Sequence, residues 1–333
     1  MSIARDRLTQ LLQKFEQKKI VVIGDLILDQ YIWGDVSRIS PEAPVPVVLV
    51  EKESFMPGGA ANVAASISAL EGNAVLAGVI GNDSGGKILK SYLRKNADVG
   101  GVFVDAKRKT SIKIRIVARR QQVVRVDKEV IAEIRKEMSE KILAFIERKI
   151  SSIDAIIIED YGKGVINPFL IKAVVAMARK HKVLVTVDPK EDHFSYYSGV
   201  TCLTPNQHEA EKAAGIVIVD IPSLLTAGKK LLKKLRSDAL LITRGEHGMC
   251  LFERGKKAIH IPTRAQEVFD VSGAGDTVIG AFTLALAGGA SLEEAAHISN
   301  YAAGVVVGKV GVSTCSQREL LQRVDQDLRL GAV

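Results

Sequence analysis

The stretch DAIIIEDYGKGVINPFLIKAVVAMARKHKVLVTVD, residues 154–188, decides the class of fold that the sequence predicts. It opens with an apolar run at 154–160, continues as a helical pattern at 167–181 and closes with a second apolar run at 182–188. Strands this rich in Val, Ile and Leu, separated by a helix, are typical of parallel sheets buried on both faces. We therefore expect a layered α/β domain with a mostly parallel sheet.

The same alternation runs outward from this unit over nearly all of the 333 residues. It predicts helices at 4–18, 83–95 and 206–214, and strands at 19–25, 74–80, 199–204 and 239–245. No internal repeat or low-complexity linker divides the chain, so we expect a single domain over residues 1–333. In such sheets, ligands bind beyond the carboxyl ends of the strands.

Two segments depart from this pattern. Residues 31–52 and 109–127 alternate apolar and polar side chains without helices between them, as in an antiparallel sheet with one solvated face. The basic stretch 107–120 would also suit an RNA-binding strip, but its period of two favours half-buried strands. We expect a small antiparallel β lid inserted into the main domain, and no nucleic-acid partner.

The composition restricts the class of protein. The chain is 47% hydrophobic and 25% charged, and its 46 basic and 38 acidic residues are interleaved, as in a globular protein. The charged amino end lacks the apolar core of a signal peptide, and no stretch approaches the ~18 apolar residues of a membrane span. Three widely spaced cysteines, Cys202, Cys250 and Cys315, suggest neither a disulfide framework nor a zinc site. We expect a cytoplasmic protein with no membrane partner.

The motif DVSGAGD, residues 270–276, precedes the apolar helical stretch TVIGAFTLALA at 277–287. Gly273, Ala274 and Gly275 would leave backbone amides at the start of this helix open to an anion, which the helix dipole favours. Asp276 beside such an anion would accept a proton from an attacking hydroxyl while the amides stabilise a transferred phosphoryl group. Alternatively, Asp270 or Ser272 merely caps a closely packed helix.

Another glycine-rich stretch, GNDSGGKI at 81–88, has the G-x-x-x-x-G-K spacing of a P-loop. A P-loop also needs a Ser or Thr hydroxyl on magnesium after the lysine, and this position holds Ile88. We interpret the stretch as an ordinary turn between a strand and a helix, with no phosphate role for Lys87.

Two further motifs carry groups suited to ligands. PGGAANVAASISAL, residues 57–70, begins a helix with glycines and Asn62, where a polyhydroxylated ligand could contact the backbone and an amide side chain. TPNQHEAE, residues 204–211, places Asn206 and Glu209 on one helix face, where the carboxylate could hold magnesium through water. The alternatives are close helix packing for the first motif and a helix cap for the second.

The motifs GGAANVA (58–64), N-x-x-E (206–209) and D-x-x-G-A-G-D (270–276), in this order, resemble the ribokinase-like carbohydrate kinases of the phosphofructokinase-B type. The resemblance covers nearly the whole chain and implies a ribokinase-like α/β/α domain with a β lid that uses ATP and Mg²⁺. It also implies that Asp276 is the catalytic base and that Gly273, Ala274 and Gly275 form the anion hole.

The resemblance implies further ligand contacts. For ATP it implies Gly273, Gly275, Asn206, Glu209 (also to Mg²⁺, through water), Thr243, Arg244, Gly245, Asn300 and Ala303. For the sugar hydroxyls it implies Asp25, Gly58, Gly59 and Asn62. The motif of the family has Thr where this chain has Val271. A K⁺ site would use Asp270, Ser272 and the loop near Gly311 and Ser313.

A narrower resemblance, to the heptose 7-phosphate kinase branch of the family, rests on five stretches: 24–48, 56–64, 159–164 (EDYGKG), 187–190 (VDPK) and 243–252. It implies ATP-dependent phosphorylation of the anomeric hydroxyl of D-glycero-D-manno-heptose 7-phosphate to the 1,7-bisphosphate, for nucleotide-heptose and lipopolysaccharide core synthesis. The phosphate of this substrate needs cations. Lys163 and Lys190, just after two strand ends, are the candidates, beside the lid residue Arg115; solvated surface lysines are the alternative. Asp160 is a further expected contact of the substrate.

Three expectations concern partners and alternatives. Related bacterial proteins often fuse the kinase to a nucleotidyltransferase. This sequence has no second nucleotide-binding pattern after residue 315, so we expect a stand-alone kinase or an isolated domain, with a separate adenylyl- or guanylyltransferase acting downstream. Exposed strand edges of the lid predict a homodimer through lid pairing. Another sugar or nucleoside kinase of the family, such as a ribokinase or fructokinase, and a non-catalytic sugar or nucleotide sensor on the same fold are the alternatives.

Overall fold

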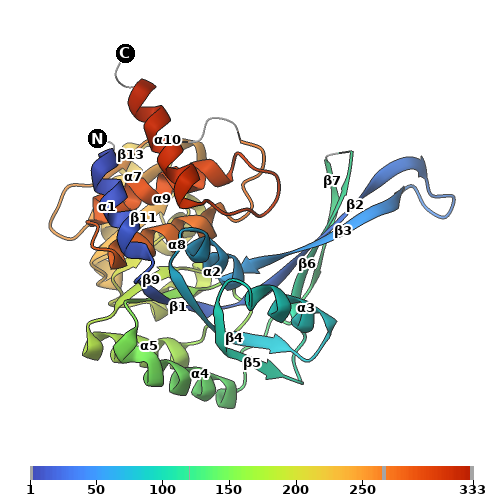
Figure 1. Ribbon diagram of the computed structural model, residues 1–333, viewed down its shortest axis with the longest axis horizontal. Helices are drawn as coiled ribbons and strands as arrows, with labels where there is room; N and C mark the ends of the chain where they lie inside the picture. Colours follow the sequence, from blue (N-terminus) through green and yellow to red (C-terminus); the bar gives the residue numbers. More distant parts are fainter. Residues whose placement is uncertain (1–2, 120, 265–267, 331–333) are drawn as a thin grey trace.

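The computed structural model describes residues 3–119, 121–264 and 268–330, and within these ranges it contains a nine-stranded sheet flanked by helices (Figure 1). From one edge to the other, the strands are β13 (Ile259–Ile261), β12 (Met249–Glu253), β11 (Ala239–Thr243), β10 (Cys202–Leu203), β9 (Leu184–Asp188), β8 (Ala155–Glu159), β1 (Lys19–Gly24), β4 (Asn73–Gly81) and β5 (Asp98–Asp105). Neighbouring strands are parallel except at β11–β12 and β12–β13. The predicted α/β class with a mostly parallel sheet is confirmed.

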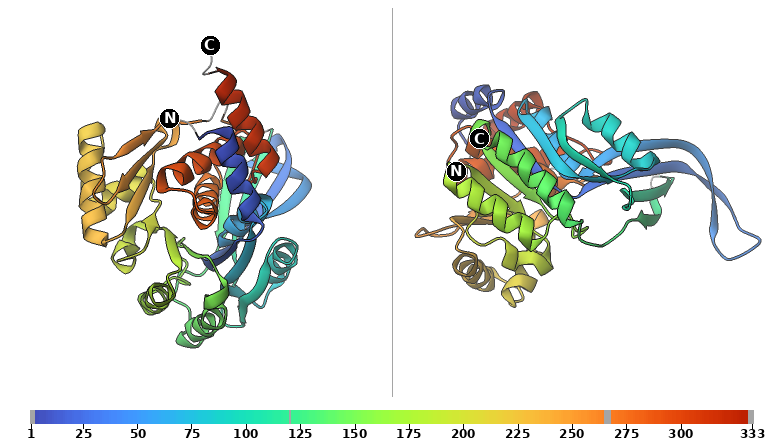
Figure 2. Two further views of the ribbon diagram at one scale, coloured as in Figure 1. Left: turned by 60° about the vertical axis from the view of Figure 1, so that its left-hand side comes forward. Right: turned by 90° about the horizontal axis from the view of Figure 1, so that it is seen from below.

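The central strands are buried on both faces because helices cover both sides of the sheet. In β1, Ile20 and Val22 pack into one hydrophobic core, and Val21 and Ile23 pack into the other. The first core includes α1 (Arg5–Phe15), α2 (Ala60–Ala69), α3 (Ser84–Leu93), α8 (Ala274–Ala287), α9 (Leu292–Val306) and α10 (Gln317–Leu330). The second includes α4 (Lys136–Lys149), α5 (Pro168–His181), α6 (Gln207–Ala214) and α7 (Ile221–Leu235), and Figure 2 shows α4 and α5 side by side.

The helices begin where local sequence signals favour a start. The side chain of Asn167 accepts a hydrogen bond from the amide of Leu170, and Pro168 follows it, so α5 begins with both a cap and a pre-set backbone angle. Asp220 caps α7 in the same way through the amide of Ser223. No helix in the described parts of the chain is long and apolar enough to span a membrane.

The strand predicted at 199–204 is much shorter than expected. Only Cys202 and Leu203 form β10. Gly199 has a φ of 77°, a left-handed conformation that a strand cannot continue through, and its amide donates to the carbonyl of Leu235. The apolar pattern of this segment therefore indicates that it is buried, whereas Gly199 prevents the strand from beginning at residue 199.

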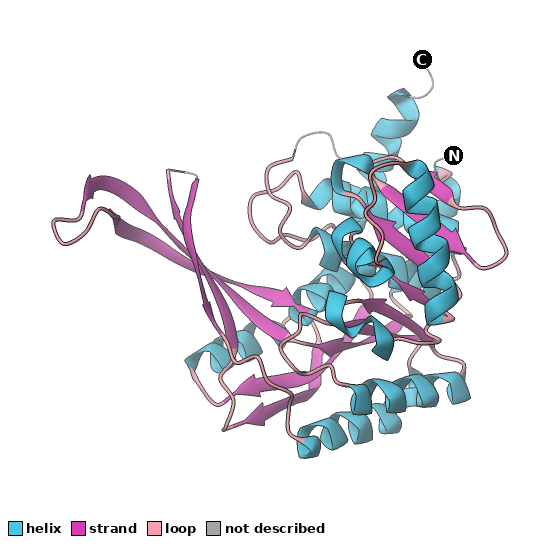
Figure 3. Ribbon diagram, turned by 180° about the vertical axis from the view of Figure 1, so that it is seen from behind, coloured by secondary structure: helices cyan, strands magenta, loops and turns pink. Residues whose placement is uncertain are grey.

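The lid is a separate four-stranded sheet that projects from the body (Figures 1 and 3). Its order is β3 (Pro46–Gly59), β2 (Leu26–Ile39), β6 (Ser111–Ala118) and β7 (Gln121–Lys128). The prediction of a lid formed by 31–52 and 109–127 locates these strands, but the expectation that it is wholly antiparallel is wrong, because β2 and β6 pair in parallel. Both strands leave the body in the same direction, β2 after β1 and β6 after β5, and so they run side by side with one orientation.

A buried carboxylate at the end of β1 fixes the loop that follows β8. Asp25 is 2% exposed, and its two oxygens accept hydrogen bonds from the backbone amides of Tyr161, Lys163 and Val165 at 2.9–3.1 Å. Burial raises the pKa of Asp25 to about 6, although these amides act in the opposite direction. The loop 161–165 is thus held against β1 by one side chain.

This arrangement predicts a pH-dependent difference in stability between the protein and its Asp25→Asn variant. Between the ordinary pKa of 3.8 and about 6, folded Asp25 keeps a proton that the unfolded chain has released. The free energy of unfolding of the unmodified protein should therefore fall, relative to the variant, as the pH rises through this window, and should level off above it. Urea unfolding at pH 4, 5, 6 and 7 measures the difference, and a constant difference across this range would contradict the assignment.

Candidate active site

Two adjoining cavities lie beyond the carboxyl ends of the parallel strands. The larger one, of about 730 Å³, is lined by residues of β11, β12, α8 and α9 and of the loops between them. The smaller one, of about 310 Å³, is lined by residues that follow β8, β9, β10 and β11 and by the start of α8. Thr243, Val271 and Gly275 line both cavities, so a ligand extending across these residues could occupy them together.

The start of α8 presents backbone amides to the smaller cavity. Gly273 is the N-cap residue with a φ of 78°, and no side chain caps the helix, so the alternative of a cap by Asp270 or Ser272 is wrong. A Cβ atom on Gly273 would lie 2.6 Å from the side-chain nitrogen Nδ2 of Asn62, so this position favours a glycine. Uncapped amides at a helix start favour an anion, as predicted for Gly273, Ala274 and Gly275.

Asp276, in the first turn of α8, is 3% exposed and is held by two side chains from other segments. The Asn62 amide donates to its Oδ2 at 2.7 Å, and the Tyr161 hydroxyl donates to its Oδ1 at 2.8 Å. Burial raises the pKa of Asp276, while both hydrogen bonds lower it. The carboxylate is therefore oriented and desolvated, which suits a group that accepts a proton.

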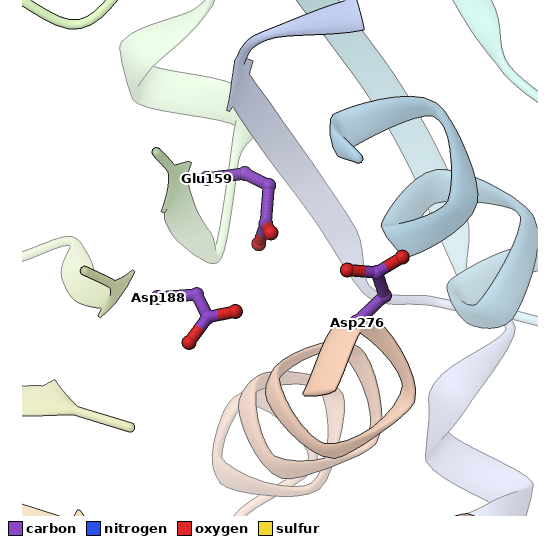
Figure 4. A group of neighbouring side chains, drawn as sticks. All are labelled: Glu159, Asp188 and Asp276. Carbon is purple, nitrogen blue, oxygen red and sulfur yellow. The ribbon is translucent and has the colours of Figure 1, made fainter. Parts of the chain in front are cut away.

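Two further carboxylates converge on Asp276, and Figure 4 shows the three groups facing a common space. Glu159 ends β8 and Asp188 ends β9, and one oxygen from each of the three residues lies within 4.8 Å of the others. Burial and the neighbouring carboxylates raise the pKa of both Glu159 and Asp188 well above the ordinary range. Neither oxygen of fully buried Glu159 has a hydrogen-bond partner in the described structure. Such a cluster matches the oxygen ligands of a divalent cation.

The larger cavity gathers most of the residues predicted to contact the nucleotide. Its lining includes Thr243, Arg244, Gly245, Asn300 and Ala303. The Asn300 amide donates to the carbonyl of Pro262 at 2.7 Å, and the Arg244 guanidinium donates to the Gln207 side chain at 3.1 Å. Segments more than 50 positions apart in the sequence thus meet around one space with apolar walls and a few polar groups, as small-molecule sites require.

Asn206 and Glu209 both line the smaller cavity and also form a helix cap. The Asn206 side chain accepts from the amide of Glu209 at 2.9 Å, while Oε2 of Glu209 accepts from the amide of Asn206 at 2.8 Å. The cap that the sequence offered as an alternative is therefore present. It orients both side chains at the cavity wall, so the two interpretations are compatible.

The expected sugar contacts lie where the lid joins the body. Gly59 has a φ of 57°, and a Cβ atom on Gly58 would lie 2.1 Å from Oδ2 of Asp29. Asp29 is 4% exposed and pairs with Arg115 of β6, so it is a buried carboxylate beside Gly58 that the sequence analysis missed. Asp25, in contrast, uses both oxygens to hold the loop after β8.

The residues predicted after β8 and β9 to contact the phosphorylated substrate already have partners. Lys163 pairs with Glu129 at 2.7 Å, and Lys190 pairs with Glu191 at 2.6 Å. Asp160 accepts hydrogen bonds from the amide of Gly162, from His193 and from the hydroxyl of Tyr197. Asp160 therefore fixes the loop after β8, although it also lines the smaller cavity together with Lys190.

The proposed monovalent-cation loop is assembled around one carboxylate. Asp270 accepts from the amide of Ser272 at 2.9 Å through Oδ1 and from the amide of Gly311 at 3.1 Å through Oδ2. The hydroxyl of Ser313 donates to the carbonyl of Gly311 at 3.2 Å. The two segments named from the sequence therefore lie together.

The P-loop-like stretch is an ordinary turn, as interpreted from the sequence. Asp83 caps α3 by accepting from the amide of Gly86 at 2.8 Å, and it also accepts from the amide of Thr110 at 2.9 Å. A Cβ atom on Gly86 would lie 2.4 Å from the carbonyl oxygen of Gly81. These glycines serve close packing, and exposed Lys87 lines neither cavity.

Several site residues were missed although they lie in the quoted stretches EDYGKG (159–164) and VDPK (187–190). Glu159 and Asp188 each end an apolar strand that the sequence did predict, and their positions at the carboxyl ends of neighbouring parallel strands could have revealed them. Tyr161 lies two residues after Glu159, in the EDYGKG stretch. Its contact with Asp276 joins segments 115 positions apart and has no local signal.

Comparisons with known proteins show the family of this chain. The model of the pfkB family carbohydrate kinases matches residues 17–319. The Bifunctional protein HldE of Geobacter metallireducens is 48% identical over 316 residues, which cover 93% of this chain and 64% of the relative. The Bifunctional protein HldE of Geobacter sulfurreducens is 48% identical over 302 residues, which cover 90% of this chain and 62% of the relative. The chain thus spans less than two thirds of the length of these relatives.

Solved structures share the fold at low sequence identity. Phosphofructokinase-2 from Escherichia coli, solved with substrates and products, has a TM-score of 0.76 and is 20% identical, covering 93% of this chain and 99% of that chain. Ribokinase from Arabidopsis thaliana, solved with ribose and ATP, has a TM-score of 0.73 and is 19% identical, covering 92% of this chain and 98% of that chain.

The ribokinase-like fold predicted from the motifs is confirmed by these structures, and the family is shown by the match over most of the chain. The chain belongs to the pfkB family of carbohydrate kinases and is a phosphotransferase with an alcohol group as acceptor.

Proposed function

We propose that this kinase transfers the terminal phosphoryl group of ATP to the anomeric hydroxyl of D-glycero-D-manno-heptose 7-phosphate, giving the 1,7-bisphosphate. The observation that carries the reaction type is the buried Asp276 carboxylate, oriented by Asn62 and Tyr161 beside an uncapped helix start. The heptose branch rests on the motifs at 24–48 and 159–164 and on relatives that are 48% identical.

In the proposed mechanism, Asp276 accepts the proton of the acceptor hydroxyl as the phosphoryl group moves onto its oxygen. The amides at Gly273, Ala274 and Gly275 donate to the transferred group and stabilise its charge. The nucleotide lies in the larger cavity, between the 243–245 segment and Asn300 and Ala303 of α9. Closure of the lid over the sugar would exclude water from the buried carboxylate.

The protein residues fit a magnesium ion at the smaller cavity, whose wall includes Asp188 and Asp276. Glu159 and Asp188 offer hard oxygen ligands beside Asp276, and Glu209 would act through water from the opposite wall. The buried, unpartnered oxygens of Glu159 support this fit, because a cation would compensate their desolvation. When bound, the ion would neutralise charge on the phosphates of ATP.

Other parts of the proposal have narrower support. Asp270 and Ser272 are the candidates for K⁺, and the Escherichia coli phosphofructokinase-2 has been solved with potassium. A homodimer through the lid is supported by β7, whose residues are all exposed, and by exposed Leu49 and Val50 of β3. We place the reaction in the cytoplasm, with a nucleotidyltransferase activity acting on the product.

Another sugar or nucleoside kinase of the family is the competing function, since it would use the same base and anion hole. Such an enzyme would not require a phosphate on the acceptor. Turnover of ATP-Mg²⁺ with heptose 7-phosphate, ribose, fructose and fructose 6-phosphate separates the candidates, and we expect the fastest turnover with heptose 7-phosphate. A preference for an unphosphorylated sugar would overturn the proposed substrate.

Replacing the base tests the reaction type. Asp276→Asn should lower kcat by about 10²- to 10⁴-fold, the usual contribution of a general base, with little change in KM for ATP. Steady-state kinetics measures both constants. As a control, Lys87→Ala should keep most of the turnover, because Lys87 is exposed and lines neither cavity. A comparable loss in the Lys87 variant, or full activity in the Asp276 variant, would contradict the assignment.

Replacing Glu159 tests the cation site. Glu159→Gln keeps the shape of the side chain but removes its charge, so the Mg²⁺ concentration for half-maximal rate should rise by about tenfold or more. Titration of the rate with Mg²⁺ at saturating ATP measures this change. The matched control is Glu147→Gln, at an exposed glutamate of α4, which should leave the titration unchanged. An unaltered Mg²⁺ dependence in the Glu159 variant would remove this residue from the site.

A further inference from the structure

One face of the lid carries charged side chains and is turned toward the base. Lys113 of β6 lies opposite Asp29 of β2 and Asp127 of β7 in the strand register, and Arg115 lies opposite Arg125. Residues that face each other across paired strands, and every second residue along a strand, share one face of the sheet. By the same rule Lys52 of β3, opposite Trp33, lies on this face, which therefore holds four cations and two carboxylates.

Most cations on this face and around the smaller cavity have a carboxylate partner. The pairs are Arg115 with Asp29, Arg125 with Asp127 (2.9 Å), Lys163 with Glu129 (2.7 Å) and Lys190 with Glu191 (2.6 Å). A cation that is already neutralised gains less from a new anion than one that has no partner, because part of its field is cancelled. These pairs leave two lysines of the lid face, Lys52 and Lys113, without a carboxylate partner in the described structure.

Of these two lysines, Lys52 is exposed, whereas Lys113 is half-buried and contacts the Tyr161 ring. In the part of the chain that the structure describes, no carboxylate oxygen lies within 4.0 Å of its Nζ atom. The Nζ atom lies 4.6 Å from the centre of the Tyr161 ring, and the Tyr161 hydroxyl contacts Asp276 at 2.8 Å. Burial lowers the pKa of Lys113, whose side chain is half-buried. A partly desolvated ammonium group without a counter-ion is costly, and an anionic ligand would offset this cost.

We propose that Lys113 binds the phosphate group that the sugar substrate carries at the end remote from its acceptor hydroxyl. Lys113 and Asp276 both contact Tyr161, so a sugar whose hydroxyl reaches the base could present a phosphate at its other end to the ammonium group. The inference rests on the proposed function, because it places the acceptor hydroxyl at Asp276. Lys113 is then the residue that distinguishes phosphorylated from unphosphorylated sugars.

A purely structural role for Lys113 makes a different prediction. If its contact with the Tyr161 ring only orients that ring, loss of the ammonium group should disturb the base and lower kcat for every acceptor. If Lys113 binds phosphate, the loss should fall on the affinity for the phosphorylated sugar. Lys113→Met keeps much of the aliphatic stem and removes the charge, whereas Lys113→Arg keeps a cation.

The test measures the binding of D-glycero-D-manno-heptose 7-phosphate and of the unphosphorylated heptose by calorimetry, without ATP. For Lys113→Met we expect about 10- to 100-fold weaker binding of the phosphorylated sugar, the loss of one charge-assisted hydrogen bond, and unchanged binding of heptose. Lys113→Arg should keep much of the preference for the phosphorylated sugar, because the cation remains. The control, Lys128→Met, changes an exposed lysine on the other face of the lid and should leave both affinities unchanged.

The outcomes separate this inference from the proposed function. Equal binding of both sugars by the unmodified protein, or unchanged preference in Lys113→Met, overturns the role of Lys113. The role is also overturned if Lys163→Met or Lys190→Met greatly weakens the binding of the phosphorylated sugar while Lys113→Met does not. If the unmodified protein prefers the phosphorylated sugar through Lys113 but does not phosphorylate it, the proposed reaction fails while the binding role stands.

Discussion

The hydrogen bonds that orient the buried carboxylate of Asp276 are the interactions on which the site depends. They come from Asn62 at the start of α2 and from Tyr161 after β8, and they converge on the start of α8. Asp25 at the end of β1 holds the Tyr161 loop by its backbone amides. Three segments far apart in the sequence therefore place one carboxylate, and the parallel sheet brings their ends to the same edge.

The distribution of charge around this carboxylate divides the site into regions. Glu159 and Asp188 make the region beside Asp276 acidic, which would suit a cation that neutralises charge on the phosphates of ATP. The lid side is basic, and Lys113 is a half-buried lysine of this side that has no carboxylate partner in the described structure. A phosphorylated sugar between these regions would meet a base at one end and an ammonium group at the other. This division of charge arises because the carboxyl ends of β8 and β9 supply the carboxylates, whereas β6 of the lid supplies the lysine.

The sequence predicted the framework better than the contacts. Strands such as 154–160 and 182–188 were visible because their apolar runs report burial on both faces, and the glycines of DVSGAGD marked the helix start that receives Asp276. Tyr161, Glu159 and Asp188 were not predicted, because their roles depend on how parallel strands align. The parallel pairing of β2 with β6 was missed for a related reason, since alternation reveals a strand but not its neighbour.

The most direct test of the central claim is a structure of the protein with Mg²⁺, a non-hydrolysable ATP analogue and heptose 7-phosphate. The account predicts the acceptor hydroxyl within hydrogen-bond distance of Asp276, with the terminal phosphate at the amides of Gly273 to Gly275 and the adenosine in the larger cavity. A triphosphate bound elsewhere, or an acceptor hydroxyl remote from the Asp276 carboxylate, would contradict it.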